Sequence, residues 1–202
     1  MIYQEKQMLQ FISSKTMQRT RLSKFFAILI LLLSFLLNPS QADIESQLDF
    51  ILHTSNSAPF YFKTSVDPFT LLHHGFDPDK PTKIIAHGWA ESGTFFTSEF
   101  STAYFQAGLN YNIIGIDWEK LAPILNYVQA AWNSNEVGNL TGEKIIVNTL
   151  VLGLNQDPSQ ISAIGHSLGA HLVGLMGRKV QELTGHKLTR ITGKYRSEMT
   201  KY

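Results

Sequence analysis

A glycine-containing turn constrains the fold of this chain more than any other stretch of its sequence. Residues 161–164 form a short apolar run typical of a buried strand, and the sequence Gly-His-Ser-Leu-Gly follows directly at residues 165–169. Beyond the turn, apolar side chains recur at a helical period, at Leu168, Leu172, Leu175, Met176, Val180 and Leu183. The chain is therefore predicted to run from strand through tight turn into helix without a break.

A strand, a tight turn and a helix in this order are the context in which serine hydrolases present their nucleophile. Side chains in place of Gly165 and Gly169 would strike the neighbouring strand and helix, so both glycines have a steric purpose. Ser167 would project from this turn, supported by His166, and the amide of Leu168 would point at a developing oxyanion. The alternative is a plain strand-to-helix turn, because Gly-x-Ser-x-Gly recurs by chance in roughly one chain in fifteen of this length.

A second apolar run, residues 83–86, predicts a core strand that ends in His87-Gly88-Trp89. A loop at the carboxyl end of such a strand can supply the second donor of an oxyanion hole. The Trp89 amide would be that donor, and Gly88 would let the backbone approach the substrate. The alternative is a hydrophobic strand end with a buried tryptophan.

The remaining pattern alternates strands with helices. Two short strands separated by a turn at residues 55–57 are expected within residues 49–62, and a buried strand over residues 112–118. Helices are expected over residues 95–109, 125–132 and 143–154. Alternation of this kind predicts an α/β fold with a mostly parallel, doubly wound sheet.

The first 42 residues have the pattern of a secretory signal peptide. Arg19, Arg21 and Lys24 precede an apolar run over residues 25–37, and small residues follow up to Ala42, after which we expect cleavage. A transmembrane anchor is the alternative, but 13 apolar residues fall short of the ~20 that span a bilayer. We therefore expect a secreted, extracellular chain without an integral membrane span after cleavage.

Composition narrows the functional class. A net charge of +1 and a content of 44% hydrophobic residues are typical of a globular protein. The chain lacks the excess of basic residues that a nucleic-acid-binding protein has. The chain has no cysteine, so no disulfide can stabilise it. Adjacent His73 and His74 point apart and have no other ligand near them in sequence, so we expect a solvated loop there, no metal and no cofactor. Asn139 begins the one usable glycosylation sequon and should be exposed in a secreted chain.

Taken together, these motifs resemble the pancreatic-type lipase family of α/β-hydrolases, which includes insect phospholipase A1-like proteins. The matching stretches are residues 84–93, 116–118, 127–138, 164–171 and 190–193. The resemblance implies a partial α/β-hydrolase domain over residues 43–193, with Ser167 as nucleophile and the amides of Trp89 and Leu168 as the oxyanion hole. It also implies lipid esters, either triglyceride or phospholipid, as substrates and transient contact with a lipid surface.

The sequence departs from this family after Gly193. The family continues into a segment that carries the triad aspartate, whereas residues 194–202 form an unrelated tail, so we expect the C-terminal strands to be missing. No aspartate follows Asp157, and His171 and His186 are the histidines after Ser167, so a triad in the order Ser, Asp, His cannot be completed. A serine without its base is a weak nucleophile. We therefore expect this chain to be inactive, with residues 187–192 as an unpaired edge strand.

Two functional hypotheses follow. The first is a secreted lipase or phospholipase of lipid catabolism, represented by a chain that lacks the C-terminal catalytic residues. The second is a non-catalytic secreted lipid-binding or yolk-protein-like storage protein on the same scaffold. Ser167 and the elbow glycines favour the first, because a binding protein does not need a strained serine turn.

Overall fold

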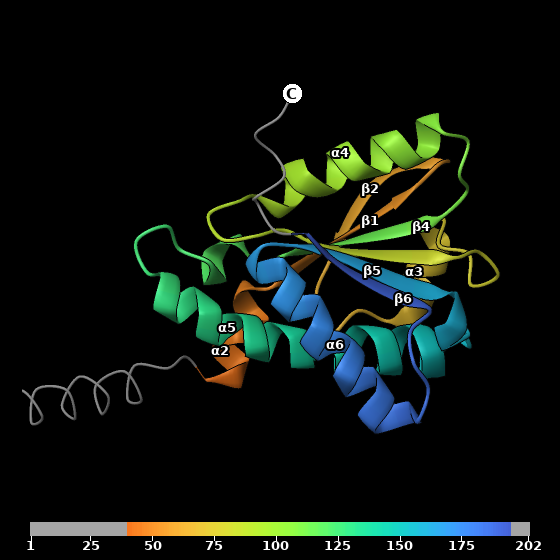
Figure 1. The fold of residues 1–202 in the computed structure, drawn as a ribbon. Helices are drawn as coiled ribbons and strands as arrows, with labels where there is room; N and C mark the ends of the chain where they lie inside the picture. The colour runs from red at the N-terminus through yellow and green to blue at the C-terminus, as the bar shows by residue number, and fades with distance from the viewer. Residues whose placement is uncertain (1–39, 195–202) are drawn as a thin grey trace, which may run out of the picture. The chain divides into compact units, whose positions relative to one another are not determined.

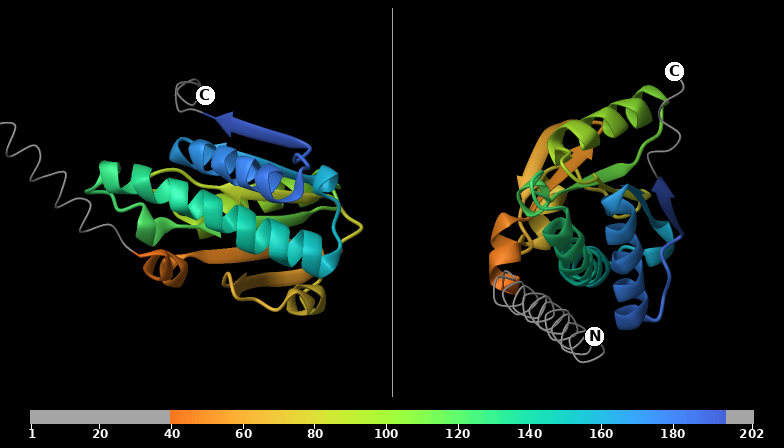
Figure 2. Two further views of the ribbon diagram at one scale, coloured as in Figure 1. Left: turned by 90° about the horizontal axis from the view of Figure 1, so that it is seen from below. Right: turned by 60° about the vertical axis from the view of Figure 1, so that its left-hand side comes forward.

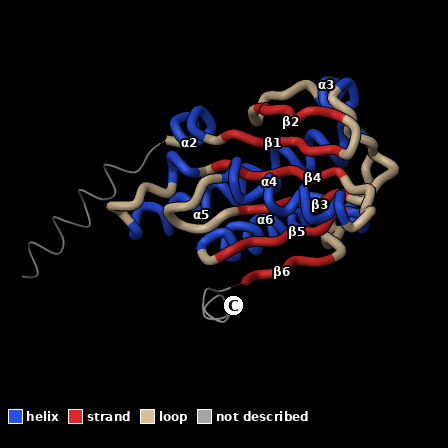
Figure 3. The backbone as a smooth tube through the Cα atoms, turned by 90° about the horizontal axis from the view of Figure 1, so that it is seen from above, coloured by secondary structure: helices blue, strands red, loops and turns tan. Residues whose placement is uncertain are grey.

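The computed structural model describes residues 40–194. They contain a single six-stranded sheet and the helices that pack on it. Its strand order is β2-β1-β4-β3-β5-β6, and Figure 3 shows the strands side by side in this order. The strands are β1 (Asp49–Thr54), β2 (Ser57–Phe62), β3 (Thr82–Ala86), β4 (Asn112–Asp117), β5 (Ile161–His166) and β6 (Arg190–Lys194).

The strands pair mostly in parallel on the side of the sheet that bears the predicted elbow. Strand β3 pairs in parallel with β4 and β5, and β5 pairs in parallel with β6. Only β1 is antiparallel to its neighbours, β2 and β4. Strand β4 is buried almost throughout because helices cover both faces, which explains its continuous apolar sequence. The predicted mostly parallel, doubly wound sheet is therefore confirmed.

Helices lie on both faces of the sheet (Figures 1 and 2). Helix α4 (Gly93–Gln106) lies over one face, whereas α5 (Tyr127–Leu140), η2 (Thr141–Gly153) and α6 (Leu168–Thr184) lie on the other. The core lies between the sheet and this second layer, and it includes the fully buried side chains of Ile84, Ile114, Ile145, Leu150 and Leu172. The short helices are α2 (Gln41–Gln47), α3 (Pro68–His73), η1 (Glu119–Leu121) and η3 (Pro158–Gln160).

The expectation of two separate helices over residues 125–132 and 143–154 is wrong. Helix α5 continues directly into η2, a π-helical segment, so one long helix crosses the sheet. A Cβ at Gly138 would lie 2.7 Å from the carbonyl oxygen of Leu172, and one at Gly142 would lie 2.8 Å from that of Met176. Close packing on α6 thus requires glycines within this long helix, and the packing overrides their low helix propensity.

The described part of the chain begins at the N-terminal cap of α2. Ser40 and Asp43 form a capping box, in which the Ser40 hydroxyl accepts from the Asp43 amide and the Asp43 carboxylate accepts from the Ser40 amide. Cleavage after Ala42, as predicted, would remove this cap. Most of the predicted signal peptide, residues 1–39, lies outside the described residues. Within residues 40–194 no helix is long and apolar enough to cross a membrane.

Two further expectations need correction. Asn139 is half-buried within α5 rather than exposed, and the hydroxyl of Thr141, which completes its sequon, is turned inward onto the Val137 carbonyl at 2.7 Å. His73 and His74 lie at the end of α3 rather than in a solvated loop, and the His74 ring stacks on Phe60 with centroids 3.6 Å apart. The Thr141 contact is local to the helix, whereas the His74 ring is placed by a residue of β2 that is distant in sequence.

Candidate active site

Ser167 occupies a strained turn between β5 and α6. Its backbone has φ = 51° and ψ = −118°, and positive φ is uncommon for residues other than glycine. Its amide donates to the carbonyl of Lys194 at the end of β6 (2.9 Å), and its own carbonyl accepts from the Ala170 amide (3.0 Å). The predicted succession of strand, strained serine and helix is therefore present.

The two elbow glycines are sterically required, as predicted. A Cβ at Gly165 would collide with the carbonyl of Gly169 across the turn. A Cβ at Gly169 would lie 2.5 Å from the carbonyl oxygen of Ala86 and would also collide with that of His87. Because backbone atoms cannot move aside cheaply, helix α6 can approach β3 this closely only with glycine at residue 169.

The loop that follows β3 lies against the serine turn. A Cβ at Gly88 would lie 3.0 Å from the Cβ of Ser167 and 3.1 Å from the carbonyl oxygen of His166. In the described part of the chain, the amides of Trp89 and Leu168 donate no hydrogen bond. Leu168 begins helix α6, and Trp89 follows Gly88 in the loop after β3, so both N–H groups predicted to form an oxyanion hole are without a hydrogen-bond partner among residues 40–194.

His87 anchors the start of this loop from a fully buried position. Its Nε2 lies 3.1 Å from the Trp118 amide and its Nδ1 lies 2.8 Å from the carbonyl of Gly88. The Trp118 amide can only donate, so Nε2 accepts, and Nδ1 carries the proton that it gives to Gly88. The Trp118 indole N–H in turn donates to the His87 carbonyl (3.0 Å), and the two rings stack. His87 therefore joins the loop to the end of β4.

The Trp89 side chain packs at the margin of the core and is held there by polar and aromatic contacts. Its indole N–H donates to the carbonyl of Pro123 (2.9 Å), and its ring meets that of Tyr127 edge-on at 5.4 Å. The ring is half-buried and packs against the hydrophobic core, so the alternative of a buried tryptophan at a strand end is met in part. The Trp89 side chain is thus anchored on the loop before α5.

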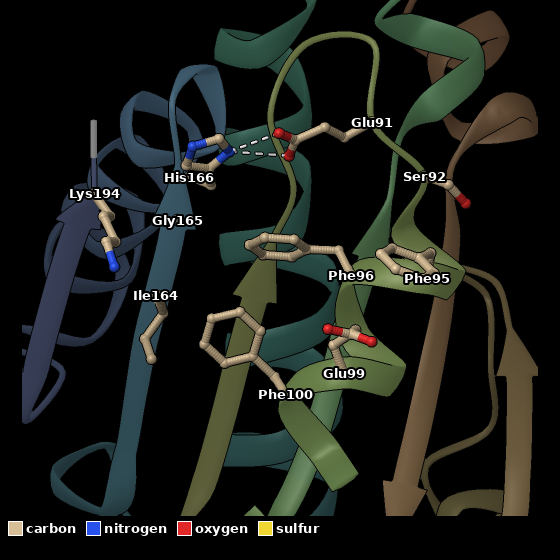
Figure 4. A pocket seen from close by; sticks show the side chains of 10 residues that line it. All are labelled: Glu91, Ser92, Phe95, Phe96, Glu99, Phe100, Ile164, Gly165, His166 and Lys194. Carbon is tan, nitrogen blue, oxygen red and sulfur yellow. Dashed lines mark hydrogen bonds and ion pairs between the residues drawn. The ribbon is translucent and has the colours of Figure 1, made fainter. Parts of the chain in front are cut away.

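Glu91 links the two loops, and sequence analysis missed it. Its Oε2 accepts from the Gly88 amide at 2.7 Å, and its Oε1 lies 2.8 Å from Nδ1 of His166, the residue before Ser167 (Figure 4). His166 is buried, and its ring stacks against Phe96 of α4 with centroids 6.0 Å apart. One side chain thus contacts both the loop after β3 and the turn after β5.

A cavity of about 510 Å³ lies beside this linkage, between α4 and the end of β5. Figure 4 shows Phe96, Phe100 and Ile164 on its walls, with His166 and Glu91 above them. The complete lining is Glu91, Ser92, Phe95, Phe96, Glu99, Phe100, Ile164, Gly165, His166 and Lys194.

The structure does not place a general base against Ser167 within residues 40–194. No hydrogen bond joins the Ser167 hydroxyl to a histidine or a carboxylate of these residues. His171 is exposed on α6 one turn beyond the serine, and His186 is exposed beyond the end of that helix. Residues 40–194 also contain no group of three or more side chains suited to binding a metal ion. The described site therefore contains the candidate nucleophile and the candidate oxyanion donors, and residues 40–194 place no base against the serine.

A serine elbow at the carboxyl end of a central parallel strand, with an oxyanion loop from a neighbouring strand, defines the α/β-hydrolase class of proteins. Comparison with known families narrows this class. The family model "Lipase" matches residues 33–199, and the chain belongs to the lipase family.

Curated relatives are similar over the same region. Pancreatic lipase-related protein 2 of Rattus norvegicus is 33% identical over 156 residues, which is 76% of this chain and 31% of the relative. Pancreatic triacylglycerol lipase of Oryctolagus cuniculus is 34% identical over 145 residues, which is 71% of this chain and 30% of the relative. Inactive pancreatic lipase-related protein 1 of Canis lupus familiaris is 34% identical over 147 residues, which is 71% of this chain and 29% of the relative. The chain thus spans about a third of the length of these relatives.

Among solved structures, the crystal structure of a putative carboxylesterase from Lactobacillus plantarum WCFS1 aligns at 17% identity with a TM-score of 0.35. This alignment covers 73% of this chain and 59% of that one.

Proposed function

We propose that Ser167 is the nucleophile of a secreted hydrolase that cleaves carboxylic esters of lipids. The amides of Trp89 and Leu168 would stabilise the oxyanion formed when the serine attacks the ester carbonyl. The observation that carries the proposal is the strained Ser167 backbone, together with a loop after β3 so close that a Cβ at Gly88 would lie 3.0 Å from the Ser167 Cβ. Strain of this kind costs of order 1–3 kcal/mol and is characteristic of functional positions.

Membership of the lipase family supports lipid esters as the substrate class. The relatives include proteins named triacylglycerol lipases, and triglycerides are one candidate substrate on that basis. Phospholipids, cleaved as by a phospholipase A1, are the other candidate, and a comparison of the two substrates in one fatty-acid release assay separates them. Secretion is part of the proposal because of the charged and apolar pattern that precedes residue 42.

We further propose that residues 40–194 do not activate Ser167 by themselves. Removing the base from a serine triad lowers turnover by about 10⁶, which leaves only the effects of the oxyanion hole and of binding. The alternative, a lipid-binding or storage protein on the same scaffold, predicts the same lack of turnover for the 202-residue chain. It also predicts no activity when a base is supplied.

A fluorophosphonate probe, which labels a serine that a base activates, distinguishes these possibilities. The 202-residue chain should remain unlabelled. A chimera that joins residues 1–193 to the C-terminal part of the rat relative should be labelled at Ser167, and the label should disappear in Ser167→Ala. Circular dichroism and a cooperative unfolding transition establish that each sample is folded.

Either of two results would overturn part of the proposal. Rapid labelling of the 202-residue chain at Ser167 would show that it contains its own base. A folded chimera that stays unlabelled would refute the nucleophile assignment and favour the binding protein.

A further inference from the structure

A single carboxylate joins the two loops that form the candidate site, although it contacts neither Ser167 nor the two oxyanion donors. Glu91 accepts from the Gly88 amide at 2.7 Å, and its two oxygens lie 2.8 and 3.0 Å from Nδ1 of His166. The two partners are far apart in sequence and flank the site: Gly88 precedes Trp89, and His166 precedes Ser167. Hydrogen bonds to an ionised carboxylate are shorter and stronger than neutral ones.

The backbone between Gly88 and Glu91 is strained. Ala90 has φ = 57°, in the left-handed region that residues with a Cβ rarely adopt. A strained conformation persists only where the surrounding structure holds it in place. His87 holds one end of this segment through Trp118, and Glu91 holds the other through His166. The Trp89 amide lies between these two anchors, so its direction depends on both.

The pairing with His166 also limits an electrostatic cost. A carboxylate next to an oxyanion hole would repel the negative charge that develops there. The imidazole N–H of His166 and the amide of Gly88 both point at Glu91 and compensate its charge. His166 is buried, and its Nε2 has no hydrogen-bond partner within residues 40–194, so Glu91 is the polar partner that orients this ring in the described structure.

We propose that Glu91 is a positioning residue that fixes the oxyanion loop against the nucleophile turn. The inference rests on the proposed function, since it assigns Glu91 a role only if the Trp89 amide stabilises an oxyanion. It makes a separate structural claim that can be tested without any catalysis. Glu99 provides a matched control, because it lines the same cavity but forms no hydrogen bond or ion pair within the described residues.

The structural claim is tested by amide hydrogen exchange of the full 202-residue chain, measured by NMR. In Glu91→Ala the Gly88 amide should exchange about tenfold faster or more, since a charged acceptor is lost. The imidazole N–H signal of His166 should shift or disappear through exchange. Glu91→Gln retains one acceptor oxygen and should restore part of the Gly88 protection. Glu99→Ala should change neither signal.

The functional claim is tested in the labelled chimera by resolving the probe reaction into binding and chemistry. Glu91→Ala should lower the maximal rate of labelling by about 10- to 100-fold, because small displacements of an oxyanion donor have costs of this size. The probe concentration for half-maximal rate should stay unchanged, because the proposal gives Glu91 a role in positioning the loop rather than in binding the probe. Glu91→Gln should retain part of the maximal rate that Glu91→Ala loses. The control Glu99→Ala should leave the maximal rate unchanged.

Failure of this inference is distinguishable from failure of the proposed function. A chimera that is labelled at Ser167 with the same maximal rate in Glu91→Ala would refute the role of Glu91 and leave the nucleophile assignment intact. Unchanged exchange of the Gly88 amide in Glu91→Ala would refute the positioning role of Glu91 independently of any labelling result. The third outcome is faster Gly88 exchange in Glu91→Ala together with a folded chimera that stays unlabelled. It would show that Glu91 holds the two loops together, but it would overturn both the catalytic role of this contact and the proposed function.

Discussion

Replacing glycine by alanine at two positions of α6 tests whether the elbow depends on backbone contact. Gly169 and Gly174 lie in the same helix, but a Cβ at Gly174 meets nothing within 4 Å, whereas one at Gly169 lies 2.5 Å from the Ala86 carbonyl oxygen. Alanine is favoured over glycine within a helix by about 0.5–1 kcal/mol. We therefore expect Gly174→Ala to stabilise the chain by that amount.

At residue 169 the same propensity gain is opposed by overpacking. Real Cβ atoms essentially never approach closer than 3.0 Å, so either α6 or β3 must shift. Overpacking of this kind costs typically 1–3 kcal/mol, and backbone neighbours place it at the upper end. The free energy of unfolding of Gly169→Ala should therefore lie about 2–3 kcal/mol below that of Gly174→Ala.

Urea unfolding of the two variants measures this difference. With a slope of about 2 kcal/mol per molar urea, the midpoints should differ by roughly 1 M. Unchanged slopes would show that both variants unfold from a comparable folded state. If Gly169→Ala is as stable as Gly174→Ala, the contact between α6 and the end of β3 is not as close as described, and the steric argument for the elbow fails.

Three further predictions concern the surroundings of the site. Burial holds the pKa of His53 below its ordinary value, so the folded state favours the neutral imidazole. The stability that neutral His53 contributes is complete above about pH 6.5 and should fall as the pH drops towards 5. In His53→Leu the urea midpoint of unfolding should therefore depend less on pH over this range. Trp118→Phe leaves the buried His87 carbonyl without its indole donor and should lower the free energy of unfolding by about 1–3 kcal/mol, whereas the exposed Trp132→Phe should change it by less than about 0.5 kcal/mol. Because Asn139 is half-buried in a helix, folded protein exposed to glycosylation machinery should stay unmodified there, and intact mass should show no difference in glycan content between wild type and Asn139→Gln.

Local patterns predicted the elements that carry the site because those elements have local causes. The strand before Gly165 and the helix after Ser167 follow from apolar periodicity, and the glycines follow from the turn itself. The same is true of the strand that ends at His87. Their meeting in space also follows, since parallel neighbouring strands bring their carboxyl ends to the same edge of the sheet.

The contacts that hold the site together could not be predicted in this way. Glu91 and His166 are 75 positions apart, and nothing in the sequence near either residue marks the other as its partner. The union of α5 with η2 also depends on a distant element, because glycines that disfavour an isolated helix permit close packing on α6. Sequence patterns report the covalent neighbourhood of a residue, whereas both of these features arise from tertiary contacts.

The geometry around Ser167 also restricts where an activating base can stand. Helix α6 begins directly after the serine, and the loop after β3 occupies one flank, since Gly88 lies in contact with the serine side chain. On the other flank β6 ends beside the turn, where the Lys194 carbonyl accepts the Ser167 amide. The side chain of Lys194 is exposed at this end of β6. If Ser167 is the nucleophile, as proposed, a histidine that activates it, whether from the same polypeptide or another, is therefore expected to approach past the end of β6 rather than across the oxyanion loop.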